Sequence, residues 1–172
     1  MHRYFFALWP DDEVRGQLDA VSKRLPDGCG RRVRTENLHI TLVFLGHVDE
    51  AVLERISREV DGIHAAGTEL KLDASGWWKK PQVIWLGAGS VPEPLVHLVT
   101  RLNTVAGANG MRIDCRPYTP HLTLVRKAKR PLQQFSFTPI HWKIMDFCLV
   151  ESVTHASGVE YLRRHNWPLT SS

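Results

Sequence analysis

The pattern of apolar and polar residues divides the chain into strand-like and helix-like segments. Apolar residues alternate with polar ones or form short runs, as in β-strands, over 3–9, 38–45, 69–74, 83–86 and 121–125. They recur at intervals of three and four residues, as on the buried face of a helix, over 10–25, 49–65 and 92–105. The sequence therefore predicts a chain in which strands and helices are mixed.

Capping residues mark where the predicted helices begin. Pro10 begins the first helix, and the carboxylates of residues 11–13 lie in its first turn, where they complement the helix dipole. Asp49 is the expected cap of the second helix. Pro92 and Pro94 begin the third. Glycines follow the first and the third helix and predict their ends.

Strands dominate the predicted C-terminal third. They are expected at 134–138, 143–153 and 159–164, and the last two form a hairpin through residues 156–158. Residues 77–81, which contain two tryptophans, two lysines and a proline, are predicted to be a turn between the two halves of the chain.

The order of these elements repeats approximately. A strand, a helix and a second strand occur from Tyr4 to Leu45 and again from Val83 to Val125. We therefore predict an α+β fold, a single bilobal domain over 1–172 whose lobe-forming pseudo-repeats span approximately 3–75 and 82–169. Largely antiparallel sheets would line a central cleft between the two pseudo-twofold-related lobes, with helices on the outside.

A histidine–threonine tetrad occurs once in each repeat, as His39-Ile40-Thr41-Leu42 and as His121-Leu122-Thr123-Leu124. Because alternate residues of a strand point to the same face, the histidine and the threonine of each tetrad share one face. In the first strand the other face holds apolar residues, from Leu38 to Phe44. If the two strands lie side by side or face each other, two histidines and two threonines line one cleft.

Either tetrad alone is equally compatible with a buried, hydrogen-bonded histidine in a core strand. A chain of this composition should contain only roughly 0.1 such tetrads by chance, however. The presence of two copies therefore favours one shared functional site.

The charge of the chain is mildly basic, with a formal net charge of +4 at pH 7. Basic residues bunch at 31–34, 79–80, 126–130 and 163–164. Solvated surface is the simplest interpretation of any single bunch, but together they suit a polyanionic partner such as RNA.

The cysteines and the hydropathy indicate a cellular setting. Cys29, Cys115 and Cys148 are widely spaced and form neither a C-x-x-C motif nor a zinc pattern, which fits a reduced cytoplasmic environment. No apolar run approaches the roughly 20 residues of a membrane span, and the N-terminal run differs from a signal peptide. We expect a cytoplasmic monomer with no membrane association and no obligate protein partner.

Two histidines and two threonines on one cleft suit phosphoryl chemistry. One imidazole can accept a proton from water while the other, as imidazolium, donates one to a leaving oxygen. The threonine hydroxyls can donate to non-bridging phosphate oxygens. Arg126 could add a fixed positive charge. Strand alternation, however, puts Arg126 on the face opposite His121, so it reaches the cleft only if the strand ends or bulges there.

Competing chemistries lack their motifs. Neither tetrad is accompanied by a third ligand at metal-binding spacing, so we expect no metal. The chain contains no G-x-S-x-G elbow, no Walker A loop and no G-x-G-x-x-G loop, and we expect no cofactor. The seven other histidines are interpreted as surface or loop residues: His2, His47, His64, His97, His141, His155 and His165.

The tetrads and their flanking residues resemble a known family. Two H-x-T-x tetrads about eighty residues apart resemble the two-histidine phosphoesterase superfamily. Within it, the segments 3–8, 36–46 and 116–126 are similar to the bacterial and archaeal RNA 2',3'-cyclic phosphodiesterases, also called 2'-5' RNA ligases. The similarity includes 83–87 and 167–169, so it spans nearly the whole chain.

The resemblance implies hydrolysis of a terminal RNA 2',3'-cyclic phosphate to a 2'-phosphate, with possible reversible 2'-5' ligation. In that scheme His39 is the proton donor to the departing 3' oxygen and His121 the proton acceptor from water. The other implied site residues are Thr41, Thr123 and Arg126 for the phosphate, and Phe5, Phe6 and Tyr118 as candidates for contacting the base or the RNA.

Two alternatives remain open at this point. The substrate could be a small cyclic phosphate or a 2'-5' linked nucleotide instead of an RNA end. The chain could also be a nucleotide-binding or RNA-binding module that has no catalytic activity.

Overall fold

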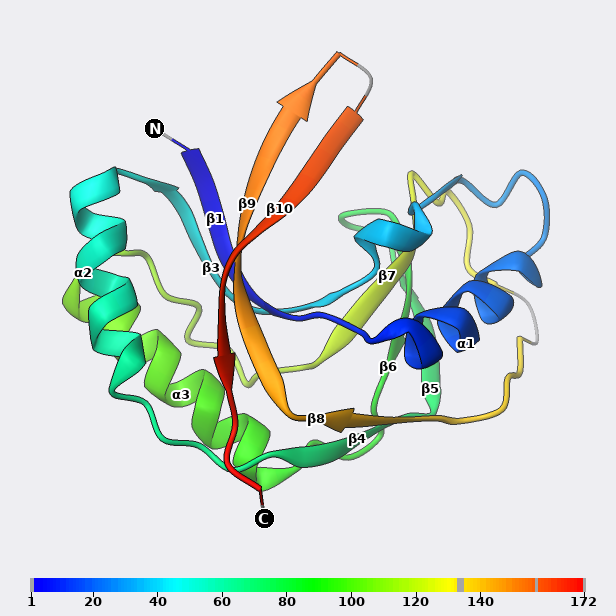
Figure 1. The fold of residues 1–172 in the computed structure, drawn as a ribbon. Coiled ribbons are helices and arrows are strands. Elements are labelled where there is room, and N and C mark those ends of the chain that lie inside the picture. Colours follow the sequence, from blue (N-terminus) through cyan, green and yellow to red (C-terminus); the bar gives the residue numbers. More distant parts are fainter. Residues whose placement is uncertain (1, 133–134, 157, 172) are drawn as a thin grey trace.

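A long antiparallel sheet forms the centre of the molecule in the computed structural model, which describes residues 2–132, 135–156 and 158–171 (Figure 1). The α-helices are α1 (Asp12–Lys23), α2 (Glu50–Asp61) and α3 (Glu93–Ala108), and a short 3-10 helix, η1, spans Thr35–Asn37. The strands are β1 (His2–Leu8), β2 (Arg31–Arg32), β3 (Ile40–Val48), β4 (Thr68–Leu72), β5 (Ala74–Trp78), β6 (Val83–Gly87), β7 (His121–Arg126), β8 (Ile140–Ile144), β9 (Asp146–His155) and β10 (Gly158–Pro168).

The sheet runs in the order β10-β9-β1-β3-β7-β6-β5, and β2 also pairs with β7. Strands β4 and β8 form a separate two-stranded sheet. The pairings between these strands are antiparallel, so the expected α+β fold with largely antiparallel sheets is confirmed. The two tetrad strands, β3 and β7, are neighbours at the middle of the sheet.

The strand pairing crosses the predicted boundary between repeats. Strands β9 and β10 come from the C-terminal end of the chain, yet β9 pairs with β1 and so completes the half of the sheet that holds the first tetrad. Strand β5 begins at the end of the first predicted repeat and pairs with β6 of the second. The β9–β10 hairpin covers an edge of β1 that would otherwise remain unpaired. Each side of the sheet therefore contains strands from both predicted repeats.

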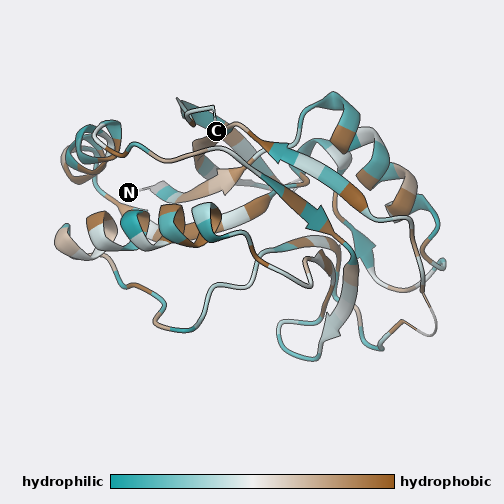
Figure 2. Cartoon of the chain, turned by 90° about the horizontal axis from the view of Figure 1, so that it is seen from below, coloured by the Kyte–Doolittle hydropathy of each residue, from teal (hydrophilic) through white to brown (hydrophobic). Residues whose placement is uncertain are grey.

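The helices pack their apolar stripes against one face of the sheet. In Figure 1, α2 and α3 lie at one side of the molecule and α1 at the other. Figure 2 shows apolar residues on the helix faces that turn towards the strands. The buried residues of the helices include Leu18, Ile56 and Leu98, and they share one core with Ile40 and Leu122 of the tetrad strands. This packing leaves the opposite face of the tetrad strands for the histidines.

Each helix begins at or close to the position that the sequence predicted. The Asp11 carboxylate accepts a hydrogen bond from the Val14 amide at 2.8 Å and caps α1. Asp49 occupies the cap position of α2, although its side chain makes no capping hydrogen bond. None of the described helices is both long enough and apolar enough to span a membrane.

Several predicted boundaries were wrong. Residues 77–81 are not all turn, because β5 extends to Trp78 and forms a hairpin with β6. The predicted strand at 134–138 is absent over 135–138, and Gln134 lies outside the described residues. The strand expected at 143–153 is two strands, β8 and β9, which belong to different sheets. The predicted C-terminal hairpin is present and longer than expected, as β9 and β10.

Candidate active site

The register of β3 and β7 brings the two tetrads together. Ile40 pairs with Leu122 in an antiparallel arrangement, and both side chains are fully buried in the core. The residues on either side of each therefore project from the opposite face of the sheet, which places both histidines and both threonines on that face. Diagonal neighbours across two strands are typically about 7–8 Å apart, a spacing that leaves room for a phosphate group between the imidazoles.

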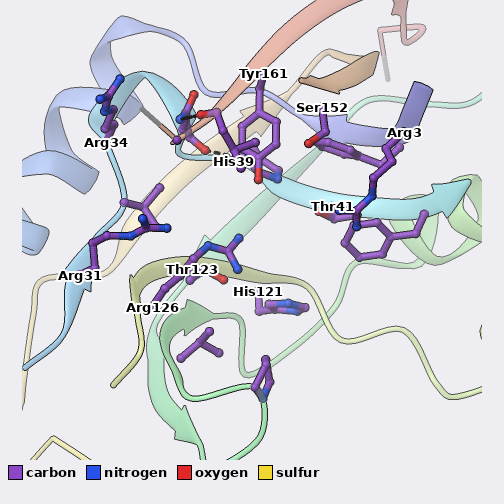
Figure 3. Close-up of a pocket in the computed structure, with 18 of the residues that line it drawn as sticks. Arg3, Arg31, Arg34, His39, Thr41, His121, Thr123, Arg126, Ser152 and Tyr161 are labelled. Carbon is purple, nitrogen blue, oxygen red and sulfur yellow. Dashed lines mark hydrogen bonds between the residues drawn. The ribbon is translucent and has the colours of Figure 1, made fainter. Parts of the chain in front are cut away.

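A cavity of about 650 Å³ lies over this face and is lined by both tetrads. Figure 3 shows His39 and His121 from the two strands on either side of it, with Thr41 and Thr123 beside them. The cavity walls come from β1, β3, β7 and the β9–β10 hairpin. The sequence prediction that two histidines and two threonines line one cleft thus agrees with the structure.

Each tetrad strand bulges just after its threonine. In β3, Thr41 pairs with Ala7 and Val43 with Phe6, so Leu42 is an extra residue. In β7, Thr123 pairs with Trp85 and Val125 with Ile84, so Leu124 is extra in the same way. A one-residue bulge reverses the alternation of the side chains that follow it. The condition for Arg126 to reach the cleft is met, and Arg126 lines the cavity.

The bulge in β3 also changes the position of Phe44. Strand alternation predicted that Phe44 shares the buried face with Leu38 and Ile40. The structure instead places Phe44 on the cavity side with 63% of its surface exposed. The sequence reasoning missed this residue because it applied a two-residue period across the bulge, although Phe44 and Arg126 each follow a tetrad histidine by the same number of residues.

The two imidazoles are held in the same way. The Nδ1 atom of His39 lies 2.7 Å from the Asn37 carbonyl oxygen, and Nδ1 of His121 lies 2.9 Å from the Thr119 carbonyl oxygen. A carbonyl oxygen only accepts, so each Nδ1 carries the proton and donates it. In the neutral imidazole Nε2 is then left as an acceptor, available for proton transfer in the cavity.

The surroundings of the two histidines differ. Phe5 and Trp9 stack on His39, with ring centroids 5.0 and 5.4 Å away, and Tyr161 meets it edge-on at 5.0 Å. His121 meets Trp78 edge-on at 4.6 Å. His39 is therefore enclosed by three aromatic rings.

Burial disfavours the charged form of both histidines. It is the main cause that lowers the pKa of His39 from 6.5 to about 4, although the hydrogen bond to the Asn37 carbonyl opposes it. Burial likewise lowers the pKa of His121. The positive charge of Arg126 lowers both pKa values further. An anion bound between the imidazoles would act in the opposite direction and favour their charged forms.

The aromatic residues expected to contact a base have other positions. Phe6 is fully buried on the core side of β1, where its ring packs against Phe147 and Trp167, so it is not available as a base platform. Phe5 lines the cavity but is 4% exposed beneath His39. The Tyr118 hydroxyl donates to the Thr41 carbonyl oxygen at 3.1 Å, which ties the loop before β7 to β3.

The cavity has a basic rim. Four arginines line it in addition to Arg126, from β1, from β2 and from the segment that follows β2: Arg3, Arg31, Arg32 and Arg34. Figure 3 shows Arg31, Arg34 and Arg126 at one end of the cavity and Arg3 at the other. Of the basic bunches predicted to contact a polyanion, the one at 31–34 thus lies at the cavity, together with Arg126.

The described residues contain no group of three or more His, Cys, Asp or Glu side chains placed to hold a metal ion. The donors that converge on the cavity are instead imidazoles, hydroxyls and guanidinium groups. This set is suited to binding an anion and to moving protons.

Comparisons with known proteins identify similar sequences and structures. Residues 8–85 match the family described as LigT-like phosphoesterase. The chain is 32% identical to an RNA 2',3'-cyclic phosphodiesterase of Escherichia coli, over 98% of this chain and 97% of that protein. It is 29% identical to a protein of the same name from Archaeoglobus fulgidus, over 92% and 96%. The crystal structure of E. coli LigT complexed with 3'-AMP superimposes with a TM-score of 0.88 at 32% identity, covering 98% of both chains.

Proposed function

This chain belongs to the LigT-like phosphoesterase family of the two-histidine superfamily, and from that premise we propose that it hydrolyses the terminal 2',3'-cyclic phosphate of RNA to a 2'-phosphate. The observation that carries the proposal is the pair of imidazoles on one face of the sheet, each with Nδ1 bonded to a backbone carbonyl and Nε2 free for proton transfer. The relatives named above support the choice of substrate.

In the proposed reaction, water attacks the phosphorus and the bond from phosphorus to the 3' oxygen breaks. His121 accepts the proton that water loses, and His39 donates a proton to the departing 3' oxygen. The 2' oxygen keeps the phosphate. At the end of the step His121 is charged and His39 is neutral, so proton exchange with solvent restores the starting state.

The threonines and Arg126 have supporting roles in this proposal. The hydroxyls of Thr41 and Thr123 donate to the non-bridging oxygens, where negative charge increases in the transition state. Arg126 adds a fixed positive charge from the end of β7. The bulge at Leu124 favours this role because it turns the Arg126 side chain towards the cavity.

Substrate binding supplies a reason for His39 to act as an acid although burial lowers its pKa to about 4. The cyclic phosphate carries a negative charge into a buried cavity. That charge favours the imidazolium form of the nearest histidine and raises its pKa towards neutrality. The proton donor would therefore become charged only when a phosphate is present.

We place the base of the terminal nucleotide on Phe44 instead of Phe5 or Phe6. Phe44 is the most exposed of the large apolar residues in the described structure and lines the cavity beside Thr41. Bases stack on exposed aromatic faces. The E. coli relative was crystallised in complex with 3'-AMP, which supports a nucleotide as the ligand.

The same arrangement would catalyse 2'-5' ligation if the 5' hydroxyl of a second RNA took the place of water as the nucleophile, and cleavage of that 2'-5' bond would be the reverse step. We also propose that the chain acts as a cytoplasmic monomer, where its three free cysteines remain reduced. Small cyclic phosphates remain the alternative substrate, because the cavity admits a nucleotide without requiring a longer chain.

Product analysis tests the proposal. An oligoribonucleotide with a 2',3'-cyclic phosphate end and a cyclic mononucleotide would each be incubated with the protein in the presence of a chelator. We expect conversion to the 2'-phosphate, and the His39→Ala/His121→Ala double variant serves as the control. A 3'-phosphate product would contradict the bond assignment, and nucleotide binding without any product would identify a binding module.

A further inference from the structure

Arg31 and Arg126 lie directly opposite each other on β2 and β7. Both line the cavity, and Figure 3 shows both side chains at the same end of it. Within the described part of the chain neither guanidinium has a carboxylate partner, whereas the neighbouring Arg32 and Arg34 pair with Asp27 and Glu36. Like charges placed directly opposite on antiparallel strands destabilise the pairing. An anion held between the two guanidinium groups would offset that repulsion.

A glycine before Arg31 allows the backbone to approach β7 closely at this position. Gly30 has φ of +143°, and a Cβ atom there would lie 2.6 Å from the Arg126 carbonyl oxygen and 2.7 Å from Cγ1 of Val125. Only glycine combines this φ with so close an approach. The Val33 amide then donates to the Leu124 carbonyl oxygen at 2.8 Å. Strand β2 is thus fixed against β7 beyond the point where β3 pairs with it.

The two arginines of β2 both line the cavity but differ in their contacts. The Arg32 guanidinium donates to the Leu25 carbonyl oxygen and contacts Asp27, so it is held by the loop that follows α1. Arg31 has no such carboxylate contact within the described residues, so its charge is available to an anion in the cavity. Along β7, Leu122 pairs with Ile40 of β3, and Val125 and Arg126 then pair with β2. Arg31 therefore extends the site from the tetrads towards one end of the cavity.

We propose that Arg31 and Arg126 form a clamp for a second phosphate, the phosphodiester next to the reacting cyclic phosphate in an RNA chain. The inference rests on the proposed function and specifies its substrate class as a polynucleotide end. Arg126 lies three residues beyond Thr123 in the sequence, about 7–10 Å along a strand at roughly 3.3 Å per residue. Guanidinium groups at that distance from the tetrads are placed for a neighbouring phosphate, to which each can donate two hydrogen bonds.

The test compares the activity of the wild type and of one variant on two substrates. For wild type and Arg31→Ala, kcat/KM would be measured with a nucleoside 2',3'-cyclic phosphate and with an oligoribonucleotide that ends in the same cyclic nucleotide. We expect the substitution to lower kcat/KM for the oligonucleotide about tenfold more than for the mononucleotide, since a charge-assisted hydrogen bond is lost with only one of them. Equal losses with the two substrates would overturn the second-phosphate clamp.

Salt dependence gives a second readout. Each phosphate contact to a single strand contributes about 0.7 to the slope of log binding against log salt. Arg31→Ala should reduce that slope by about 0.7 for the oligonucleotide. An unchanged slope contradicts the proposal, whatever the effect on the rate.

Two further variants complete the design. Arg31→Lys keeps the charge and should retain more of the preference for the oligonucleotide than Arg31→Ala does, and the reverse order would contradict the clamp. Arg101→Ala removes an exposed arginine from α3, away from the cavity, and should leave both substrates unaffected. If wild type converts neither substrate, the proposed function fails, whereas a lost difference between substrates overturns the clamp alone.

Discussion

Phe44 and Arg126 occupy equivalent positions in the two tetrad strands. Each follows its histidine by five residues, and each is turned to the cavity by a bulge at the leucine after the threonine. The histidine and the threonine are thus the same in both strands, but the residue that follows the bulge and faces the cavity differs. One side of the cavity has an aromatic ring at this position and the other a guanidinium group, so the two sides of the cavity differ in chemistry.

The first prediction concerns Phe44. Stacking of a base on an aromatic side chain is worth about 1–3 kcal/mol, so Phe44→Ala should raise KM for a cyclic nucleotide by about tenfold or more. Phe44→Tyr keeps the ring and should stay close to wild type. Met145→Ala, which truncates another exposed apolar residue (47%), is the control. A KM that does not change in Phe44→Ala would place the base elsewhere.

The second prediction is that turnover depends on the two tetrad histidines and not on the other histidines. Replacing His39 or His121 by Ala should each lower kcat by about 10²- to 10⁴-fold, as expected when a general acid or base is lost. The two effects should be far from additive in the double variant, because both groups act in one step. His97→Ala removes an exposed histidine from α3 and should have no effect on turnover. Turnover near that of wild type in both single variants would exclude the proposed mechanism.

The third prediction concerns the pH profile. The free enzyme has a His39 pKa of about 4 and a His121 pKa below 6.5. One charged and one neutral imidazole are therefore most populated together on the acid side of neutrality, and kcat/KM should be bell-shaped with its maximum below pH 6.5. The maximum of kcat should lie at higher pH, because the bound phosphate raises the pKa of His39. Coinciding maxima for kcat and kcat/KM would contradict this coupling.

The fourth prediction concerns stability. The pKa of His39 falls from 6.5 in the unfolded chain to about 4 in the folded protein, so the unfolded state binds more protons between these values. The free energy of unfolding should therefore rise with pH across this interval, and His39 contributes about 3 kcal/mol that is present above pH 6.5 and lost as pH falls through 4.

Chemical denaturation at several pH values would measure this contribution. His39→Asn removes the titrating group and should flatten the pH dependence between pH 4 and 6.5. His97→Asn changes an exposed histidine and should keep the slope of the wild type. An identical slope in the His39 variant would show that its protonation is not linked to folding.

Much of the site could be predicted from the sequence because its pattern is local. A histidine and a threonine two residues apart on a strand share one face whatever surrounds the strand, and the alternating apolar residues show that the other face is buried. The three helices follow from the same kind of local periodicity, together with proline and aspartate at their first turns.

The tertiary structure decided what depends on distant partners. The register of Ile40 with Leu122 joins residues far apart in the chain, and the bulges at Leu42 and Leu124 exist only relative to β1 and β6. Those bulges reverse the side-chain alternation, which is why Phe44 and Arg126 face the cavity. The sequence determined which groups share a face for the proposed chemistry, because alternation along a strand is a property of neighbours. Their meeting in one cavity depends on non-local pairing, and only the folded sheet fixes it.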